Sequence, residues 1–168
     1  PHALNSLRNE YPEFGGHYAV LHHTQLLDEL LTQGRLQVNA ELQRVVFHDP
    51  CYLGRHNGEF DAPRAVLARL RSDAPLEIAL NREKAMCCGG GGGRMWLDEK
   101  IGTRINVLRV EQALASTPQV IATACPYCAV MMADGLAAVP TAGATKSRDI
   151  AELVAEALLS PSSPAATR

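Results

Sequence analysis

Arg44-Val45-Val46-Phe47-His48-Asp49-Pro50-Cys51 is the stretch of sequence that decides the fold. Its first half is a β-branched, apolar run and Asp49-Pro50 is a turn signal, so it predicts a buried strand that ends just before Cys51. A second run at residues 119–123 ends just before Cys125, and a short run at residues 76–80 precedes the Cys87-Cys88 pair. Each group of cysteines therefore follows a predicted strand.

Helical patterns lie between and after these strands. Apolar residues recur at helical spacing from residue 24 to the stop at Gly34, and again from residue 61 to Asp73-Ala74-Pro75. Further helices are expected at residues 98–115, from Cys125 onward and at residues 146–159, and an additional strand is expected at residues 17–22. The alternation predicts an α/β fold with a largely parallel sheet flanked by helices. Ligands of such sheets collect at the carboxyl ends of the strands, so we expect the cysteine loops to meet there.

The length of 168 residues fits one domain with additional end segments. We expect residues 1–16 to be the tail of a preceding module or a linker, and residues 17–159 to form the cysteine-rich domain. Residues 160–168 are rich in Ser, Pro and Ala and are expected to be disordered. The opening residues have neither a basic nor an apolar segment and do not read as a signal peptide.

Composition and charge exclude several classes of function. Hydrophobic residues make up 46% and charged residues 20% of the chain, and the formal net charge is −2. No basic footprint for nucleic acid is present, and no apolar run approaches the roughly 18 residues of a membrane span. The odd number of cysteines, two of them adjacent, favours metal or redox chemistry in a reducing, cytoplasmic compartment over disulfides.

The cysteine spacing, C-x35-C-C-x36-C-x-x-C, predicts one metal site. Thiolates are soft ligands that suit iron–sulfur clusters, zinc and Cu(I). Adjacent cysteines diverge and rarely bind one tetrahedral ion together, whereas a cluster of several irons accommodates them. Five thiolates exceed the four that zinc or a cubane cluster takes, so either the cluster is larger or non-cubane, or one cysteine stays free. The expected ligands are Cys51, Cys87, Cys88, Cys125 and Cys128.

Three alternatives to a cluster remain open from the residues alone. Buried inert thiols would explain the cysteines but not their spacing. A zinc-stabilised structural or interaction domain would use four of the thiolates. The five glycines at residues 89–93 could cradle a phosphate, but the phosphate-loop lysine is missing, so a loop that covers a cluster is favoured.

Four stretches carry a family resemblance: residues 48–55, 86–96, 102–106 and 124–128. On these residues the chain resembles the cysteine-rich CCG domain of heterodisulfide reductase B-type subunits and of glycolate and lactate oxidase iron–sulfur subunits. Residues 22–25, 51–57 and 87–96 are most similar to the C-terminal module of membrane iron–sulfur reductases that pass electrons from electron-transfer flavoprotein to menaquinone.

The resemblance implies an electron-transfer module of an oxidoreductase that binds a [4Fe-4S] or non-cubane cluster through the five cysteines. It also implies other redox subunits or domains as partners, with electron-transfer flavoprotein among them, and no nucleic acid. Any attachment to the cytoplasmic face of a membrane would come from a part of the protein that lies N-terminal to this segment.

Overall fold

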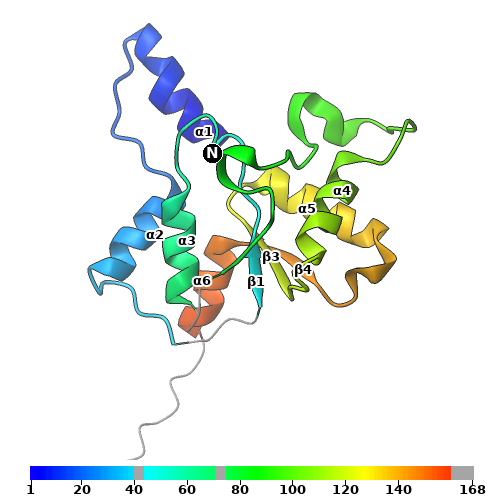
Figure 1. The fold of residues 1–168 in the computed structure, drawn as a ribbon. Helices are drawn as coiled ribbons and strands as arrows, with labels where there is room; N and C mark the ends of the chain where they lie inside the picture. The colour runs from blue at the N-terminus through cyan, green and yellow to red at the C-terminus, as the bar shows by residue number, and fades with distance from the viewer. Residues whose placement is uncertain (40–43, 71–74, 160–168) are drawn as a thin grey trace, which may run out of the picture.

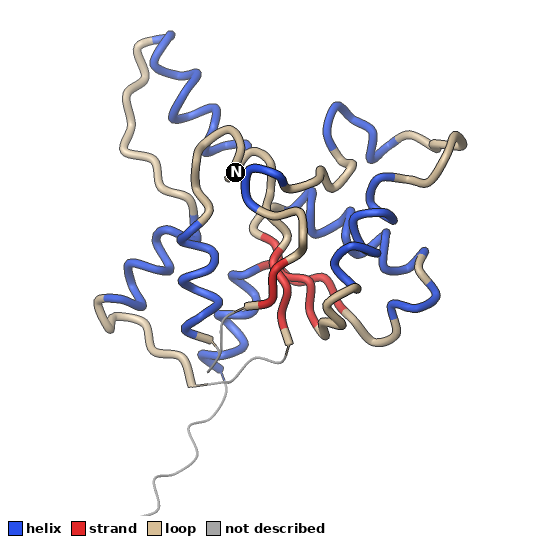
Figure 2. The backbone as a smooth tube through the Cα atoms, viewed as in Figure 1, coloured by secondary structure: helices blue, strands red, loops and turns tan. Residues whose placement is uncertain are grey.

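The computed structural model describes residues 1–39, 44–70 and 75–159. Within this part of the chain a four-stranded, all-parallel sheet has the order β2-β1-β3-β4. Its strands are β1 (Val45–Phe47), β2 (Leu76–Glu77), β3 (Val120–Thr123) and β4 (Lys146–Asp149). The predicted α/β fold with a parallel sheet is confirmed. Figure 2 shows the strands at the centre with helices on both sides.

Two groups of helices cover the two faces of the sheet (Figure 1). Residues on β1 alternate between the faces, because successive side chains of a strand point in opposite directions. The helices are α1 (His2–Asn5), α2 (His23–Thr32), α3 (Asp61–Arg69), α4 (Ile105–Leu114), α5 (Pro126–Ala138) and α6 (Ile150–Leu159). Because of the alternation along β1, Val45 and Phe47 pack toward α2, α3 and α6, while Val46 packs toward α4 and α5.

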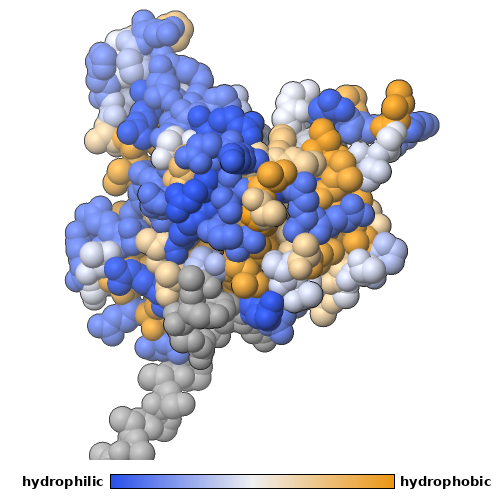
Figure 3. Space-filling view, viewed as in Figure 1, coloured by the Kyte–Doolittle hydropathy of each residue, from blue (hydrophilic) through white to orange (hydrophobic). Residues whose placement is uncertain are grey.

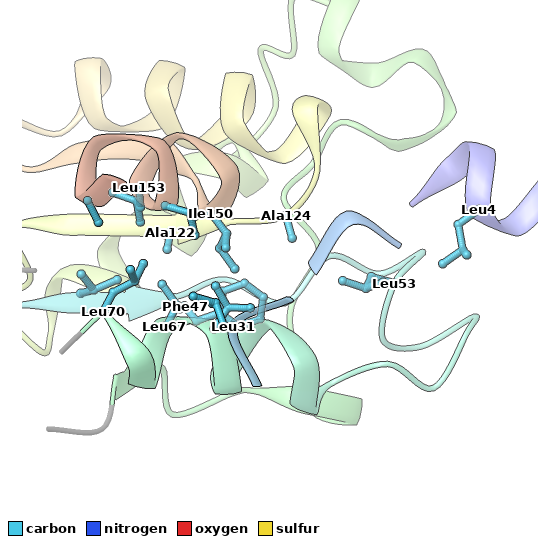
Figure 4. Close-up of a cluster of buried hydrophobic side chains, with 14 residues drawn as sticks. Leu4, Leu31, Phe47, Leu53, Leu67, Leu70, Ala122, Ala124, Ile150 and Leu153 are labelled. Carbon is cyan, nitrogen blue, oxygen red and sulfur yellow. The ribbon is translucent and has the colours of Figure 1, made fainter. Parts of the chain in front are cut away.

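The face covered by α2, α3 and α6 carries a purely aliphatic and aromatic core, which we call the aliphatic layer (Figure 4). The side chains in it come from strands and helices that are far apart in the sequence. Its buried members are Leu4, Leu31, Val45, Phe47, Leu53, Val66, Leu67, Leu70, Ala122, Ala124, Ile150, Leu153, Val154 and Ala157.

The opposite face has a core of different chemistry, which we call the cysteine layer. It contains three of the five cysteines and two methionines beside the usual aliphatic side chains. Its buried members are Val46, Ile78, Cys88, Val110, Ala113, Ile121, Cys125, Cys128, Met131, Met132, Val139 and Ala142. Sulfur chemistry is therefore concentrated on one side of the sheet.

Three local predictions are corrected. The strand expected at residues 17–22 is absent: Tyr18 and Leu21 there are mostly exposed, and Val20 packs only partly against the aliphatic layer. The helix expected from residue 98 begins only at Ile105, because Gly102 has φ +69° and Arg104 is extended. The helix expected from residue 146 begins at Ile150, since the four residues before it pair with β3 as β4.

The N-terminal residues pack on the loop that carries Cys51. Leu4 is buried in the aliphatic layer. The Asn57 side chain donates to Asn5 Oδ1 at 3.2 Å and accepts from Asn9 Nδ2 at 3.0 Å. The boundary expected at residue 17 stays a prediction, and the tail at residues 160–168 lies outside the described residues. Along the described part of the chain, none of the helices is long and apolar enough to cross a membrane.

Candidate metal centre

All five cysteines line one pocket of about 280 Å³. Cys51 follows β1 after Asp49-Pro50, and Cys125 and Cys128 follow β3 at the start of α5. Cys87 and Cys88 arrive on the loop after β2, so three loops at the carboxyl ends of parallel strands meet as such sheets allow. The structure thus brings together every cysteine that the sequence singled out, and their role as ligands stays a prediction.

The thiols form a continuous chain of contacts across the pocket. Cys51 contacts Cys87, Cys87 contacts Cys88, Cys88 contacts Cys128, and Cys128 contacts Cys125. Cys88, Cys125 and Cys128 are at most 4% exposed, whereas Cys51 and Cys87 are half-buried. The pocket therefore has a deep sulfur wall and two sulfurs nearer to its opening.

Backbone N–H groups and neighbouring thiols favour thiolates at two of the five positions. The Cys128 thiol and the N–H groups of Cys128 and Tyr127, at the start of α5, lower the pKa of Cys125 to about 6. The thiols of Cys51 and Cys88 and the N–H groups of the glycine loop hold the pKa of Cys87 well below its usual range. Cys87 and Cys125 are thus favoured as thiolates, and a cation would displace the protons that the remaining thiols hold.

The thiols of Cys51, Cys88 and Cys128 have raised pKa values. The Cys87 thiolate and burial raise the pKa of Cys51, and the Cys125 and Cys88 thiols together with burial raise that of Cys128. At Cys88 the contact with Cys128 favours the thiolate, but Cys87 and burial outweigh it and raise the pKa to about 11. In the absence of a cation, Cys51, Cys88 and Cys128 therefore keep their protons, and only Cys87 and Cys125 are favoured as thiolates.

The glycine run wraps the side of the pocket. Gly89 N–H donates to Cys87 Sγ at 3.3 Å, and its φ of +88° suits glycine. A Cβ on Gly90 would lie 3.1 Å from Met131 Cγ, so this backbone passes close to α5. At Gly91 an added Cβ would meet no atom of the described chain within 4 Å, although Gly91 lines the pocket. The positive φ explains Gly89 and close packing explains Gly90, whereas the space beside Gly91 belongs to the pocket.

Two buried side chains, the imidazole of His48 and the guanidinium of Arg109, lie behind the sulfurs. One ring nitrogen of His48 lies within 4.8 Å of both Cys88 Sγ and Cys128 Sγ, and His48 is 1% exposed. Burial and the Arg109 guanidinium lower the pKa of His48 to about 3, so its ring is neutral. Arg109 is 0% exposed, and sequence reasoning missed it because an arginine on an amphipathic helix is ordinarily solvated.

The pocket is also lined by rings from four separate segments, those of His2, Tyr52, Trp96 and Tyr127. His2 lies 4.3 Å from the Tyr52 ring and 4.9 Å from the Tyr127 ring, centroid to centroid. Trp96, at the end of the kinked segment Gly91–Trp96, is 80% exposed, and Ile101 beyond it is 97% exposed. Figure 3 shows apolar residues on the projecting lobe to which this loop belongs. His2 was not singled out from the sequence, which offers no signal that a terminal segment folds back onto the site.

The residues present fit a sulfur-rich anionic group of several atoms. A water molecule takes about 30 Å³ in the liquid, so a pocket of about 280 Å³ is far larger than one ion requires. Two buried nitrogen atoms behind the thiols, His48 Nε2 and Arg109 Nη2, have no hydrogen-bond partner among the described residues. Unpaired buried donors are costly, and a negatively charged group in the pocket would offset that cost.

Comparison with known proteins identifies the family. The model of the CCG cysteine-rich domain matches residues 45–133, which include all five cysteines. The chain belongs to the CCG cysteine-rich domain family. The resemblance drawn from residues 48–55, 86–96 and 124–128 is therefore confirmed.

Relatives of this CCG domain are named as redox proteins. The chain is 46% identical over 95% of its length to the probable iron-sulfur-binding oxidoreductase FadF of Bacillus subtilis, and 43% identical over 94% to the EtfAB:quinone oxidoreductase of Syntrophomonas wolfei. It is 34% identical over 84% to one of the subunits of the dihydromethanophenazine:CoB–CoM heterodisulfide reductase of Methanosarcina barkeri. The chain spans only 23% of the first two relatives and 34% of the third. The expected iron–sulfur cofactor agrees with the name of the Bacillus protein.

Proposed function

We propose that this chain binds one iron–sulfur cluster through Cys51, Cys87, Cys88, Cys125 and Cys128 and serves as an electron-transfer module of a larger oxidoreductase. The observation that carries the proposal is the meeting of all five thiols in one pocket. Five thiols, a pocket much larger than one ion, and adjacent cysteines that both line it favour a cluster over a single zinc.

The chain's own residues supply binding and charge balance. Cysteine thiolates hold the iron, and the N–H groups of Gly89 and of the first turn of α5 offset negative charge on sulfur. The deep sulfurs belong to the cysteine layer, so water is excluded from that side. When bound, an iron–sulfur cluster supplies reversible one-electron transfer.

The place of the module in a larger protein rests on its relatives. We propose that residues 17–159 form the module, that residues 1–16 connect it to a preceding module, and that its partners are other redox subunits or domains. The name of the Syntrophomonas relative supports electron-transfer flavoprotein as donor and a quinone as acceptor. A membrane-facing, cytoplasmic position would then come from other parts of the protein.

Metal analysis of the purified chain tests the cofactor. After anaerobic reconstitution we expect iron and acid-labile sulfide in equal amounts, about four of each for a [4Fe-4S] cluster, and an EPR signal in one redox state. An EPR signal unlike that of a cubane would indicate the non-cubane form. A colourless chain with one zinc and no sulfide would contradict the proposal and support the zinc-stabilised domain instead.

Single cysteine variants test the ligand set. Cys87→Ser, Cys88→Ser and Cys128→Ser should each lower the iron content or change the EPR signal, because serine is a poor substitute for a soft thiolate. Met86→Leu is a matched control, since Met86 precedes the pair and carries sulfur but does not line the pocket. Wild-type iron content and spectra in both Cys87→Ser and Cys88→Ser would exclude the adjacent pair as ligands.

A further inference from the structure

His48 and Arg109 form a buried pair that the ligand proposal leaves unused. His48 follows β1 directly, and its backbone N–H donates to Ala122 O at 2.9 Å, which fixes the start of the Cys51 loop beside β3. Arg109 lies in the middle of α4 and is 0% exposed. A fully buried arginine is uncommon and implies that its donors have defined partners.

The orientation of Arg109 assigns the proton on His48. Arg109 Nε donates to His48 Nδ1 at 3.0 Å, and its Nη1 donates to Leu80 O and Gln112 Oε1, both at 2.9 Å. A guanidinium has five donors and no acceptor, so Nδ1 must accept. The single proton of the neutral ring therefore lies on Nε2.

His48 Nε2 is then a buried N–H donor without a partner among the described residues. A ring nitrogen of His48 lies within 4.8 Å of both Cys88 Sγ and Cys128 Sγ. On distance alone, His48, Cys88 and Cys128 could hold a metal together. A metal bond at Nε2 would require that nitrogen to lose its proton while Nδ1 still accepts from Arg109, which is an imidazolate.

We infer that His48 is not a metal ligand but donates an Nε2–H hydrogen bond to sulfur of the bound cluster, and that Arg109 is the positioning residue that fixes this tautomer. The inference rests on the proposed function for the identity of the acceptor, and on the Arg109–His48 hydrogen bond for the identity of the donor. Side chains that hydrogen-bond the sulfurs of a cluster are among the determinants of its reduction potential.

The consequence is a raised reduction potential. Reduction adds negative charge to the cluster, and an N–H···S bond becomes stronger as the sulfur becomes more negative. The donor therefore stabilises the reduced state more than the oxidised state. Arg109 contributes in the same direction, because its buried positive charge attracts the Cys88 and Cys128 sulfurs.

The tautomer can be tested without any cluster. Nitrogen-15 NMR of the metal-free chain distinguishes protonated from unprotonated ring nitrogens, and the His48→Asn variant identifies which of the six histidine signals belongs to His48. We expect a neutral ring with Nε2 protonated and Nδ1 unprotonated. A neutral ring protonated on Nδ1 would overturn the inference, whether or not the chain binds iron.

The role of the donor is tested by the potential of the loaded chain. In His48→Phe the N–H is lost, and we expect the iron content to stay at the wild-type value. We expect the equilibrium constant for reduction to fall about tenfold, which is about 59 mV for one electron. His48→Asn keeps an N–H donor and should recover part of the shift. Loss of iron in His48→Phe together with His48→Asn would overturn the inference, because it would make His48 a ligand.

Arg109→Met tests the positioning role, with Arg104→Met as its matched control. Arg104 lies at the start of the same helix but is partly exposed and pairs with Asp134 at 2.9 Å. Arg109→Met should lower the potential, and its His48 ring should populate both tautomers in the NMR spectrum. Arg104→Met should leave the tautomer and most of the potential unchanged. Equal shifts of the potential in the two variants would mean that Arg109 acts only as one charge among several, and would overturn its positioning role.

A wild-type chain that takes up no iron and sulfide would refute the proposed function, while the NMR result on the tautomer would stand.

Discussion

The aliphatic layer and the cysteine layer lie on opposite faces of the same sheet, yet they perform different tasks. Phe47 and Val46 are neighbours on β1, and each belongs to a different layer. The aliphatic layer contains no cysteine or methionine among its described members, whereas the cysteine layer ends in three thiols of the pocket. One face can thus hold the fold together while the other commits its side chains to the site.

This division has a physical basis in how cores tolerate chemistry. Aliphatic side chains pack in fixed rotamers and gain stability from burial, without any need for a bound group. Thiols that must stay close together in order to bind a metal gain less stability from packing alone. Substitutions in the two layers should therefore separate stability from site occupancy.

The largest effect is expected from Phe47→Ala in the aliphatic layer. Phe47 is 1% exposed, and the Arg64 guanidinium lies 5.1 Å from its ring centroid. Truncation should lower the free energy of unfolding by about 3–5 kcal/mol, because it removes buried surface and leaves a cavity. Urea denaturation measures the loss. Iron per folded chain should stay at the wild-type value, and a folded Phe47→Ala chain without iron would show that the layers are not separable.

Met131→Ala in the cysteine layer should cost somewhat less stability but also disturb the site. Met131 is 3% exposed, and its side chain supports Gly90, where an added Cβ would lie 3.6 Å from Cys88 Sγ. We expect a loss of about 2–4 kcal/mol and a changed EPR signal or iron content. Leu67→Ala, at a 0% exposed position of the aliphatic layer, is the matched control and should leave the spectrum unchanged. Identical spectra in both variants would contradict the distinction.

The sequence predicted the central strands and the convergence of the cysteines, because both depend on local patterns. β1 and β3 are buried apolar runs, and loops that follow parallel strands share one edge of the sheet. β4 was missed because Lys146–Asp149 is polar and pairs with β3 through its backbone, while its side chains contribute little to either layer. The opposite error at residues 17–22 arose because the apolar run there forms no strand: Tyr18 and Leu21 are mostly exposed, and Val20 is only partly buried.

The surroundings of the thiols were less predictable than the thiols themselves. Arg109 and His2 reach the site only through tertiary packing, since one lies on a helix and the other on a terminal segment. Nothing in the spacing of either residue relative to a cysteine indicates that contact. Ligand candidates can therefore be predicted from sequence motifs, whereas the donors that tune them need the fold.

A moderate, pH-dependent effect is expected from His22, beside the aliphatic layer. Burial and then the neighbouring His23 lower the pKa of His22 to about 3, while Asp149 opposes the shift. Its pKa in the unfolded chain is about 6.5, so the unfolded state binds the proton first and stability is lost as pH falls from 6.5 toward 3. Between pH 6.5 and pH 5 this histidine should cost about 2 kcal/mol, at about 1.4 kcal/mol per pH unit.

The His22→Asn variant isolates that contribution. His22 caps α2 by accepting from Thr24 N–H at 3.4 Å, and asparagine is a good residue at the same capping position. Urea denaturation of the metal-free chain at both pH values should show a smaller loss on acidification in the variant than in the wild type. Equal losses would mean that other groups, not His22, carry the acid sensitivity.

The smallest effect on stability is expected from Gly91→Ala, where only the pocket should respond. Gly91 has no positive φ, and an added Cβ meets no described atom within 4 Å, so the unfolding free energy should change by less than about 0.5 kcal/mol. Gly92→Ala, at φ +62°, should instead cost about 1–2 kcal/mol through backbone strain. Because Gly91 lines the pocket, its methyl group should still lower the iron content or alter the EPR signal. A Gly91→Ala chain with wild-type iron and spectrum would mean that the glycine run serves the turn geometry of its own backbone, and that the bound group does not reach it.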